Sequence, residues 1–109
     1  MVSLDTVFDL LRSERRRHVL YYLNERKGEV PVEELVAAVT EGETNGSPSP
    51  GEFERVGVSL KHVHLPKAAE AEFIEYDREE GVLRVSGTPP EYDAIVTIAE
   101  VVDETDRIG

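Results

Sequence analysis

The 109-residue sequence has no cysteine, no tryptophan and a single methionine, and it has no long apolar run. Without cysteine there is no disulfide, no thiolate zinc site and no cysteine nucleophile. No stretch approaches the roughly 18 apolar residues that a membrane-spanning helix needs, and Met1 leads into no signal peptide. These absences predict a soluble cytoplasmic protein without a membrane partner, and the length suits one domain.

Basic residues are also scarce, because 12 Lys and Arg stand against 23 Asp and Glu, which gives a net charge of −11. Only three of the basic residues are lysine. A carboxylate-rich, lysine-poor surface is typical of proteins adapted to molar salt, whose ions screen the self-repulsion. We therefore expect a halophilic source, with an ordinary acidic domain as the alternative. Taken as a whole, this charge argues against nucleic acid as a partner, since phosphate binding needs Lys and Arg.

The distribution of the charge changes that interpretation. Residues 28–51 and 89–109 each carry a net charge of −5, so two segments hold most of the excess. Residues 55–69 contain no carboxylate at all. The cationic and imidazole side chains of this window are Arg55, Lys61, His62, His64 and Lys67. A low-charge basic face on an acidic body indicates an anionic partner.

Apolar spacing predicts two helices near the N-terminus. Ser3 is the predicted N-cap of the first, which has a single apolar stripe. That stripe is Leu4, Val7, Phe8 and Leu11. Ser13 is the predicted cap of a second helix, or of a continuation, that reaches Arg26, with Gly28 as its C′ residue.

A short extended link at 29–31 leads to an amphipathic helix from Val32 to about Val39. Residues 40–51 have no apolar side chain and many turn residues, which predicts a flexible loop. A long helix is then expected to about Glu72, buried on two sides because it has two apolar stripes. One stripe is Phe53, Val56, Leu60 and Val63, and the other is Val58, Leu65 and Ala69.

Pro66 predicts a kink in this long helix, because proline has no N–H group and its ring clashes with the carbonyl of His62. An alternating pattern from Ile74 to Val85 around a polar turn predicts a β-hairpin. Thr88 and Glu91 have capping-box spacing with a proline between them as N1, and they predict a last helix to about Glu104.

The last helix is apolar over more than half of its circumference. Either the helix is wedged into its own core or it forms a dimer interface, and we favour a homodimer with help from the first helix. The predicted dimerisation residues are Leu4, Phe8, Tyr92, Ile95, Ile98, Ala99 and Val102.

The order of elements predicts an α+β fold that is mostly α. Three helices followed by a two-stranded β wing form a winged helix-turn-helix, whose third helix enters the major groove. Residues 1–87 would form this DNA-binding domain, and 88–109 the additional C-terminal helix.

Two stretches resemble a family of small haloarchaeal winged-helix domains of largely unassigned function, related to ArsR-like transcriptional regulators. They are SERRRHVLYYLNERKGEVPVEELVAAV and GVSLKHVHLPKAAEAEFIEYDREEGVLRVS. The resemblance implies DNA binding for transcriptional control. This chain has Ala68 where that family usually has leucine, which thins the core, and Glu72 where a glycine commonly ends the third helix in a left-handed cap.

On this fold Ser59, Lys61 and His62 would face base edges, with Arg55 and Lys67 on phosphates. A solvated or buried polar helix face is the alternative. Arg15 and Arg16 would contact phosphate or pair with the acidic segments, and in the wing Glu79 and Glu80 oppose a DNA role. The predicted DNA contacts are Arg15, Arg16, Arg55, Ser59, Lys61, His62, His64, Lys67, Arg78 and Arg84.

Neither a metal nor a cofactor is expected, because His62 and His64 would point about 200° apart on a helix. No catalytic motif such as GxSxG, HExxH or a P-loop occurs, so an enzyme is not expected. We therefore predict a homodimeric transcriptional regulator of a halophilic archaeon that binds double-stranded DNA. The alternative is a winged-helix protein-interaction module, which acidic residues crowding the basic face would favour.

Overall fold

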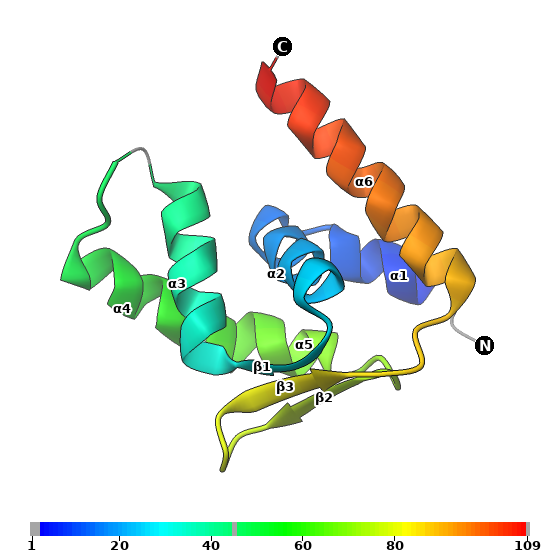
Figure 1. Cartoon of the computed structure of the whole chain (residues 1–109), viewed down its shortest axis with the longest axis horizontal. Coiled ribbons are helices and arrows are strands. Elements are labelled where there is room, and N and C mark those ends of the chain that lie inside the picture. Colours follow the sequence, from blue (N-terminus) through cyan, green and yellow to red (C-terminus); the bar gives the residue numbers. More distant parts are fainter. Residues whose placement is uncertain (1–2, 45, 109) are drawn as a thin grey trace.

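The computed structural model describes residues 3–44 and 46–108 as a mostly helical α+β fold with a small three-stranded antiparallel sheet (Figure 1). The elements are α1 (Leu4–Leu11), α2 (Glu14–Arg26), β1 (Gly28–Pro31), α3 (Val32–Glu43), α4 (Pro50–Ser59), the π-helical turn η1 (Leu60–His64), α5 (Leu65–Ala68), β2 (Ile74–Asp77), β3 (Val82–Val85) and α6 (Pro90–Ile108). The segments α4, η1 and α5 follow one another without interruption and form one long helical segment. The described part of the chain therefore has five helical segments, which are α1, α2, α3, α4–η1–α5 and α6. Met1, Val2, Asn45 and Gly109, which the expected ranges include, lie outside the described residues.

The first two helices begin where their serines predict. The Ser3 hydroxyl accepts the Thr6 N–H, and the Ser13 hydroxyl accepts the Arg16 N–H. Gly28 follows the end of α2 with a φ of 76°, as expected of a C′ residue. The buried face of α1 differs from the predicted stripe, because Val7 and Leu10 are buried whereas Leu4 and Phe8 are exposed.

The predicted loop at 40–51 is shorter than expected, because α3 continues to Glu43 and α4 already begins at Pro50. The Thr40 side chain is buried and donates to the carbonyl of Val36, and Thr44 donates likewise to the carbonyl of Thr40. These bonds satisfy the hydroxyl groups on the preceding turn, so Thr40 can be buried inside the helix without an unpaired polar group. Ser49 and Glu52 then form a capping box that starts α4.

The long helix is not a uniform α-helix, because a wider π-helical turn lies directly before Pro66. The N–H of Leu65 donates to the carbonyl of Leu60, five residues back, which defines η1 directly before the proline. A π turn of this kind accommodates the missing N–H of Pro66. The helix ends at Ala68, earlier than the predicted Glu72.

The junction to the sheet needs no left-handed residue. Ala69 closes α5 with helical dihedrals, and Lys27 is the one non-glycine residue with positive φ in the described part of the chain. Glutamate at position 72 is therefore unstrained, contrary to the expectation from the missing glycine. Ala68 is completely buried.

One face of the long helix is buried, not two. Val56, Leu60 and Leu65 lie in the core, whereas Val58 and Val63 are exposed. Each of the two predicted apolar stripes therefore has some residues in the core and at least one on the surface.

The sheet has one strand more than the predicted wing. β2 and β3 form the expected hairpin, and β1 pairs antiparallel with the other edge of β3. Val30, Leu83 and Tyr76 are cross-strand neighbours on the inner face, and Glu29, Arg84 and Glu75 are neighbours on the outer face. The extended link before α3 is thus a strand, which holds α3 beside the hairpin.

The start of α6 belongs to the core. Tyr92 is only 4% exposed and packs against Phe73, with the ring centroids 4.5 Å apart and the ring planes tilted by 57°, and Val96 is fully buried. The helix begins at Pro90, so Thr88 is not its N-cap; the Thr88 hydroxyl hydrogen-bonds to the Asp93 carboxylate instead. It also extends to Ile108, past the predicted end near Glu104.

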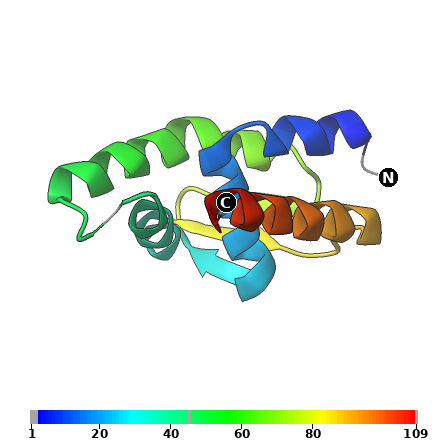
Figure 2. The ribbon, with the colours of Figure 1, turned by 90° about the horizontal axis from the view of Figure 1, so that it is seen from above.

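Seen from above, α1 and the α4–η1–α5 segment line one edge of the molecule (Figure 2). The C-terminal half of α6 projects away from the sheet (Figure 1). None of the helices in the described ranges is both long and apolar enough to cross a membrane.

Candidate nucleic-acid interface

An exposed ridge runs along α4 and η1. Its members are three or four residues apart and therefore share one helix face. They are Gly51, Arg55, Val58 and His62, and all four are exposed. Within residues 3–44 and 46–108, neither Arg55 nor His62 takes part in an ion pair, so both side chains are available to a partner.

Two further predicted contacts near this ridge are less available. Lys61 Nζ lies 2.9 Å from Glu33 Oε1 at the start of α3, and this hydrogen bond raises the pKa of Lys61. Ser59, at the end of α4, is half-buried. A carboxylate from the acidic segment therefore already occupies the position at which Lys61 would meet a phosphate.

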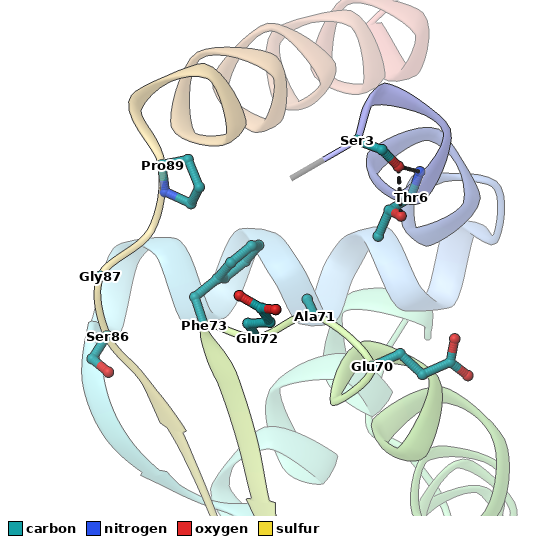
Figure 3. A pocket seen from close by; sticks show the side chains of 9 residues that line it. All are labelled: Ser3, Thr6, Glu70, Ala71, Glu72, Phe73, Ser86, Gly87 and Pro89. Carbon is teal, nitrogen blue, oxygen red and sulfur yellow. Dashed lines mark hydrogen bonds between the residues drawn. The ribbon is translucent and has the colours of Figure 1, made fainter. Parts of the chain in front are cut away.

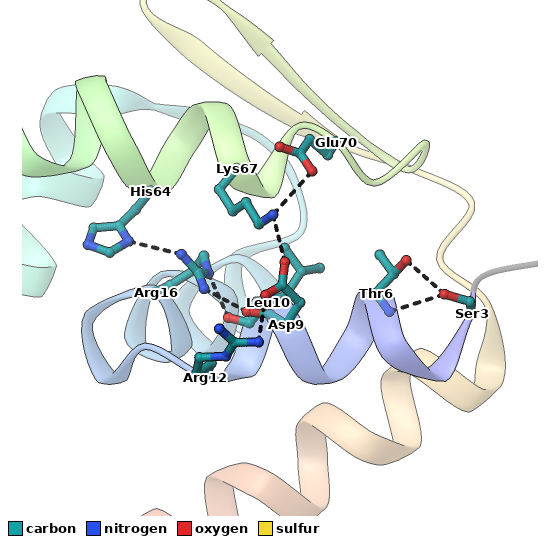
Figure 4. Close-up of polar contacts among 9 residues, drawn as sticks. All are labelled: Ser3, Thr6, Asp9, Leu10, Arg12, Arg16, His64, Lys67 and Glu70. Carbon is teal, nitrogen blue, oxygen red and sulfur yellow. Dashed lines mark hydrogen bonds and ion pairs between the residues drawn. The ribbon is translucent and has the colours of Figure 1, made fainter.

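Lys67 connects α5 to α1 instead of pointing along the ridge. Its Nζ lies 2.6 Å from Asp9 Oδ2 and 3.4 Å from Glu70 Oε1 (Figure 4). The hydrogen bond with Asp9 raises the pKa of Lys67 and lowers the pKa of Asp9. The predicted phosphate contact is therefore an internal bridge.

Arg16 is a buried structural residue and not a surface contact, which corrects its assignment to DNA. Its side chain reaches the end of α1, where Nε donates to the carbonyl of Leu10 at 2.8 Å and Nη2 to the carbonyl of Asp9 at 2.6 Å (Figure 4). A guanidinium at a helix C-terminus satisfies carbonyls that have no helical partner and complements the negative end of the helix dipole. Burial lowers the pKa of Arg16.

His64 belongs to the same cluster. Its Nδ1 lies 3.4 Å from Nη1 of Arg16, so the imidazole must accept at this nitrogen. Burial, and then the charge of Arg16, lower the pKa of His64. The side chain is half-buried and faces the body of the protein.

Arg15 faces the acidic end of α3. Its Nε and Nη2 each lie 2.7 Å from a carboxylate oxygen of Glu43, which makes a bidentate pair that raises the pKa of Arg15. The prediction left open whether this residue meets phosphate or pairs with the acidic segments, and in the structure it pairs.

The hairpin holds its two arginines in different ways. Arg84 on the outer sheet face is surrounded by four carboxylates, and the bonds to Asp77 and Glu29 raise its pKa. These carboxylates are Glu29, Glu75, Asp77 and Glu80. Arg78 at the hairpin turn packs over the Tyr76 ring, with its Cζ 5.4 Å from the ring centroid. Among the described residues no carboxylate forms an ion pair with Arg78. Arg78 is therefore the available cation of the hairpin.

The predicted dimerisation residues fall into three groups. Leu4, Phe8, Ile98 and Val102 are exposed, as is Val101. Ile95 and Ala99 are partly buried against the core. Tyr92 lies in the core and does not offer its ring to a partner, which corrects its assignment.

Asp103 anchors the exposed part of α6 to α2, a contact that sequence reasoning missed. Its Oδ2 accepts from Tyr21 at 2.6 Å and from Arg17 Nε at 2.9 Å. Burial opposes ionisation, but the bonds from Arg17 and Tyr21 keep the pKa of Asp103 below its usual value. More than 80 residues separate these partners, and no local pattern marks them. The sequence likewise did not show that Glu33 and Glu43 pair with Lys61 and Arg15, although the charge of their acidic segment was evident.

A cleft of about 550 Å³ opens between α1, the α5–β2 turn and the link to α6 (Figure 3). Its polar lining includes Ser3, Thr6, Glu70 and Glu72, and the Ser3 and Thr6 hydroxyls hydrogen-bond to each other at 2.8 Å. Phe73 forms one wall (Figure 3). The residues that line this cleft include no histidine, lysine or arginine, so it offers neither a general base of that kind nor an anion site.

Fold and surface thus define a small helical α+β domain with an exposed helix ridge beside a β-hairpin. The chain belongs to the family of the domain of unknown function DUF7344, whose model matches residues 8–84. The match runs from within α1 to β3 and leaves out α6. No curated protein and no solved structure matches the chain.

Proposed function

We propose that this protein is a winged helix-turn-helix protein that binds double-stranded DNA and regulates transcription. In this proposal α3 and the α4–η1–α5 segment form the helix-turn-helix, and β2 and β3 form the wing. The α4–η1 ridge enters the major groove and the hairpin lies along the flanking backbone. The pairing of β1 with β3 supports this assignment, because it holds α3 and the hairpin in one rigid frame.

The observation that carries the proposal is the exposed ridge, together with cations that make no ion pair in the part of the chain that the structure describes. Arg55 and Arg78 on the hairpin are exposed, and neither makes an ion pair within the described residues, although the charge of Arg55 also acts on the Glu52 carboxylate in the first turn of α4. The α5 end of the helical segment contacts β2, which places the hairpin next to this segment. Most other cations are paired internally, so the interface relies on few phosphate contacts and on direct contact with the bases.

We further propose that the protein acts as a homodimer through the exposed apolar residues of α1 and α6. Ile98 is 63% exposed, and Phe8 and Val102 are more than half exposed. Large apolar side chains exposed on the surface are typical of an interface. A two-fold dimer would place two ridges about one DNA turn apart.

A second candidate function is a protein-interaction module that does not bind DNA. The ion pairs favour it, because Glu33 and Glu43 neutralise Lys61 and Arg15, and carboxylates surround Arg84. Under this alternative the same ridge would meet another protein. The two candidates differ in whether the isolated chain binds a DNA duplex.

The test is a mobility-shift titration of the full chain against a random-sequence duplex library at several KCl concentrations. With Arg55 and Arg78 as the two guanidinium groups of this face that make no ion pair among the described residues, log K should fall against log[KCl] with a slope of only about −2 per protomer. Arg55→Gln should weaken binding about tenfold. Lys27→Gln is the matched control, because Lys27 is an exposed cation at the end of the sheet opposite the hairpin turn, and it should change little.

Absence of binding at every salt concentration would reject the DNA proposal and support the protein-interaction module. Equal losses in the Arg55→Gln and Lys27→Gln variants would reject the ridge as the contact surface. A slope several units steeper than −2 would show that the internally paired cations reach phosphate after all.

A further inference from the structure

The centre of the ridge is apolar. Val58 is an apolar residue on the outward face of the helix, between Arg55 and His62, and its side chain is 54% exposed. A β-branched residue is a poorer helix former than Lys, Glu or Arg, and an exposed valine gains little from packing. Local stability of the helix therefore does not account for valine at this position.

The cation next to Val58 does not cover it. An atom placed at the Cβ position of Gly51 would lie 3.4 Å from Arg55 Nη1, so the guanidinium is directed toward the first turn of α4. The nearest lysine, Lys61, is held by Glu33. The methyl groups of Val58 are thus the central contact that this ridge offers to a surface placed against it.

We infer that Val58 reads the C5-methyl group of thymine in the major groove. This inference rests on the proposed DNA binding and specifies how the ridge recognises its sequence. Of the four bases, thymine alone presents a methyl group in the major groove, and small apolar side chains contact it directly. Such a contact needs no counterion release, which fits a face whose cations are mostly engaged within the chain.

The experiment begins with selection of bound duplexes by the full-length protein from a random duplex library. In the selected duplex each thymine is then replaced in turn by deoxyuridine, which pairs identically but lacks the C5-methyl group. One or two positions per half-site should each lose about fourfold in affinity, as expected for one methyl group removed from contact. Thymines outside these positions serve as internal controls.

Protein variants assign this effect to one residue. Val58→Ala should bind the thymine and deoxyuridine duplexes equally. Val63→Ala is the matched control, because Val63 is 55% exposed on the same helical segment but does not share the three- and four-residue spacing of the ridge. It should keep the full discrimination. Thermal unfolding of both variants should match that of the wild type, since both side chains are on the surface.

The outcomes distinguish failure of the thymine readout from failure of the proposed DNA binding. If the wild type selects no sequence, both fail. If it selects a sequence but tolerates deoxyuridine everywhere, DNA binding stands and the thymine readout is refuted. Loss of discrimination in Val63→Ala, with Val58→Ala unaffected, would also overturn the assignment.

Discussion

Replacing Arg16 by methionine should destabilise the protein by about 2–3 kcal/mol. Methionine keeps much of the aliphatic side chain but removes the donors to the carbonyls of Leu10 and Asp9. A hydrogen bond from a charged donor contributes about 1.5–3 kcal/mol, and a buried acceptor left unpaired costs about 1–3 kcal/mol. The bond to Leu10 is buried, whereas that to Asp9 is only partly buried, so water can replace part of the second. Because methionine also avoids the cost of burying a guanidinium, the net loss stays below the sum of the two bonds.

Arg15 offers a matched control one residue away. Its pair with Glu43 is partly exposed, and pairs of this kind contribute about 0–1 kcal/mol. Thermal unfolding followed by circular dichroism measures both variants under the same salt. With about 4 °C per kcal/mol for a domain of this size, Arg16→Met should lower Tm by about 10 °C and Arg15→Met by at most about 4 °C.

Equal small losses in the two variants would refute the structural role of Arg16. A variant of Arg16 that keeps its Tm but loses DNA binding would restore the original interpretation of this residue as a phosphate contact. The comparison is informative because the two arginines are adjacent in sequence and differ chiefly in burial, Arg16 being only 7% exposed.

Three further predictions concern an ion pair, the exposed face of α6 and the half-buried histidine. Glu33→Gln should free Lys61, raise DNA affinity about fivefold and steepen the KCl dependence by about one unit, whereas unchanged affinity in the mobility shift would mean that the pair does not limit binding. Ile98→Glu should convert a dimer to a monomer with little change in Tm, measured by light scattering; a wild type that is monomeric throughout, or a dimer that survives the substitution, contradicts the interface. In the folded state the pKa of His64 lies below the ordinary histidine value of 6.5, so the unfolded chain takes up this proton first as the pH falls. Its contribution is therefore complete above about pH 6.5 and decreases below it, so the wild type should lose more Tm on acidification than His64→Gln; parallel curves would refute the lowered pKa of this half-buried imidazole.

Local chemistry was enough to predict where several elements begin and end. Ser3 and Ser13 cap their helices as expected, and Gly28 follows the second helix with positive φ. These signals act between a side chain and backbone groups two to four residues away, so the sequence contains both partners. The hairpin from Ile74 to Val85 was equally evident, because alternation and a polar turn are properties of adjacent residues.

Where the tertiary environment decides, the predictions were incomplete. The stretch after Val39 has no apolar residue and was expected to be a loop, but Thr40 is buried and its hydroxyl bonds within the helix. The strand at Gly28–Pro31 pairs with residues more than 50 positions away, so no local pattern specified its neighbour. Likewise the apolar surface of α6 was evident, but only packing against Phe73 placed Tyr92 inside the core.

The candidate site shows the same division. The sequence by itself determined that a carboxylate-free basic helix lies between two acidic segments. Only the tertiary structure decided which cations remain available: Lys61 forms an ion pair with Glu33, which is 28 residues away, whereas Arg55 forms no ion pair within the described residues. The physical reason is that an ion pair forms within about 4 Å, a distance that chain packing sets and composition does not. Composition thus places the charge along the chain, and the fold determines which charges are left for a partner.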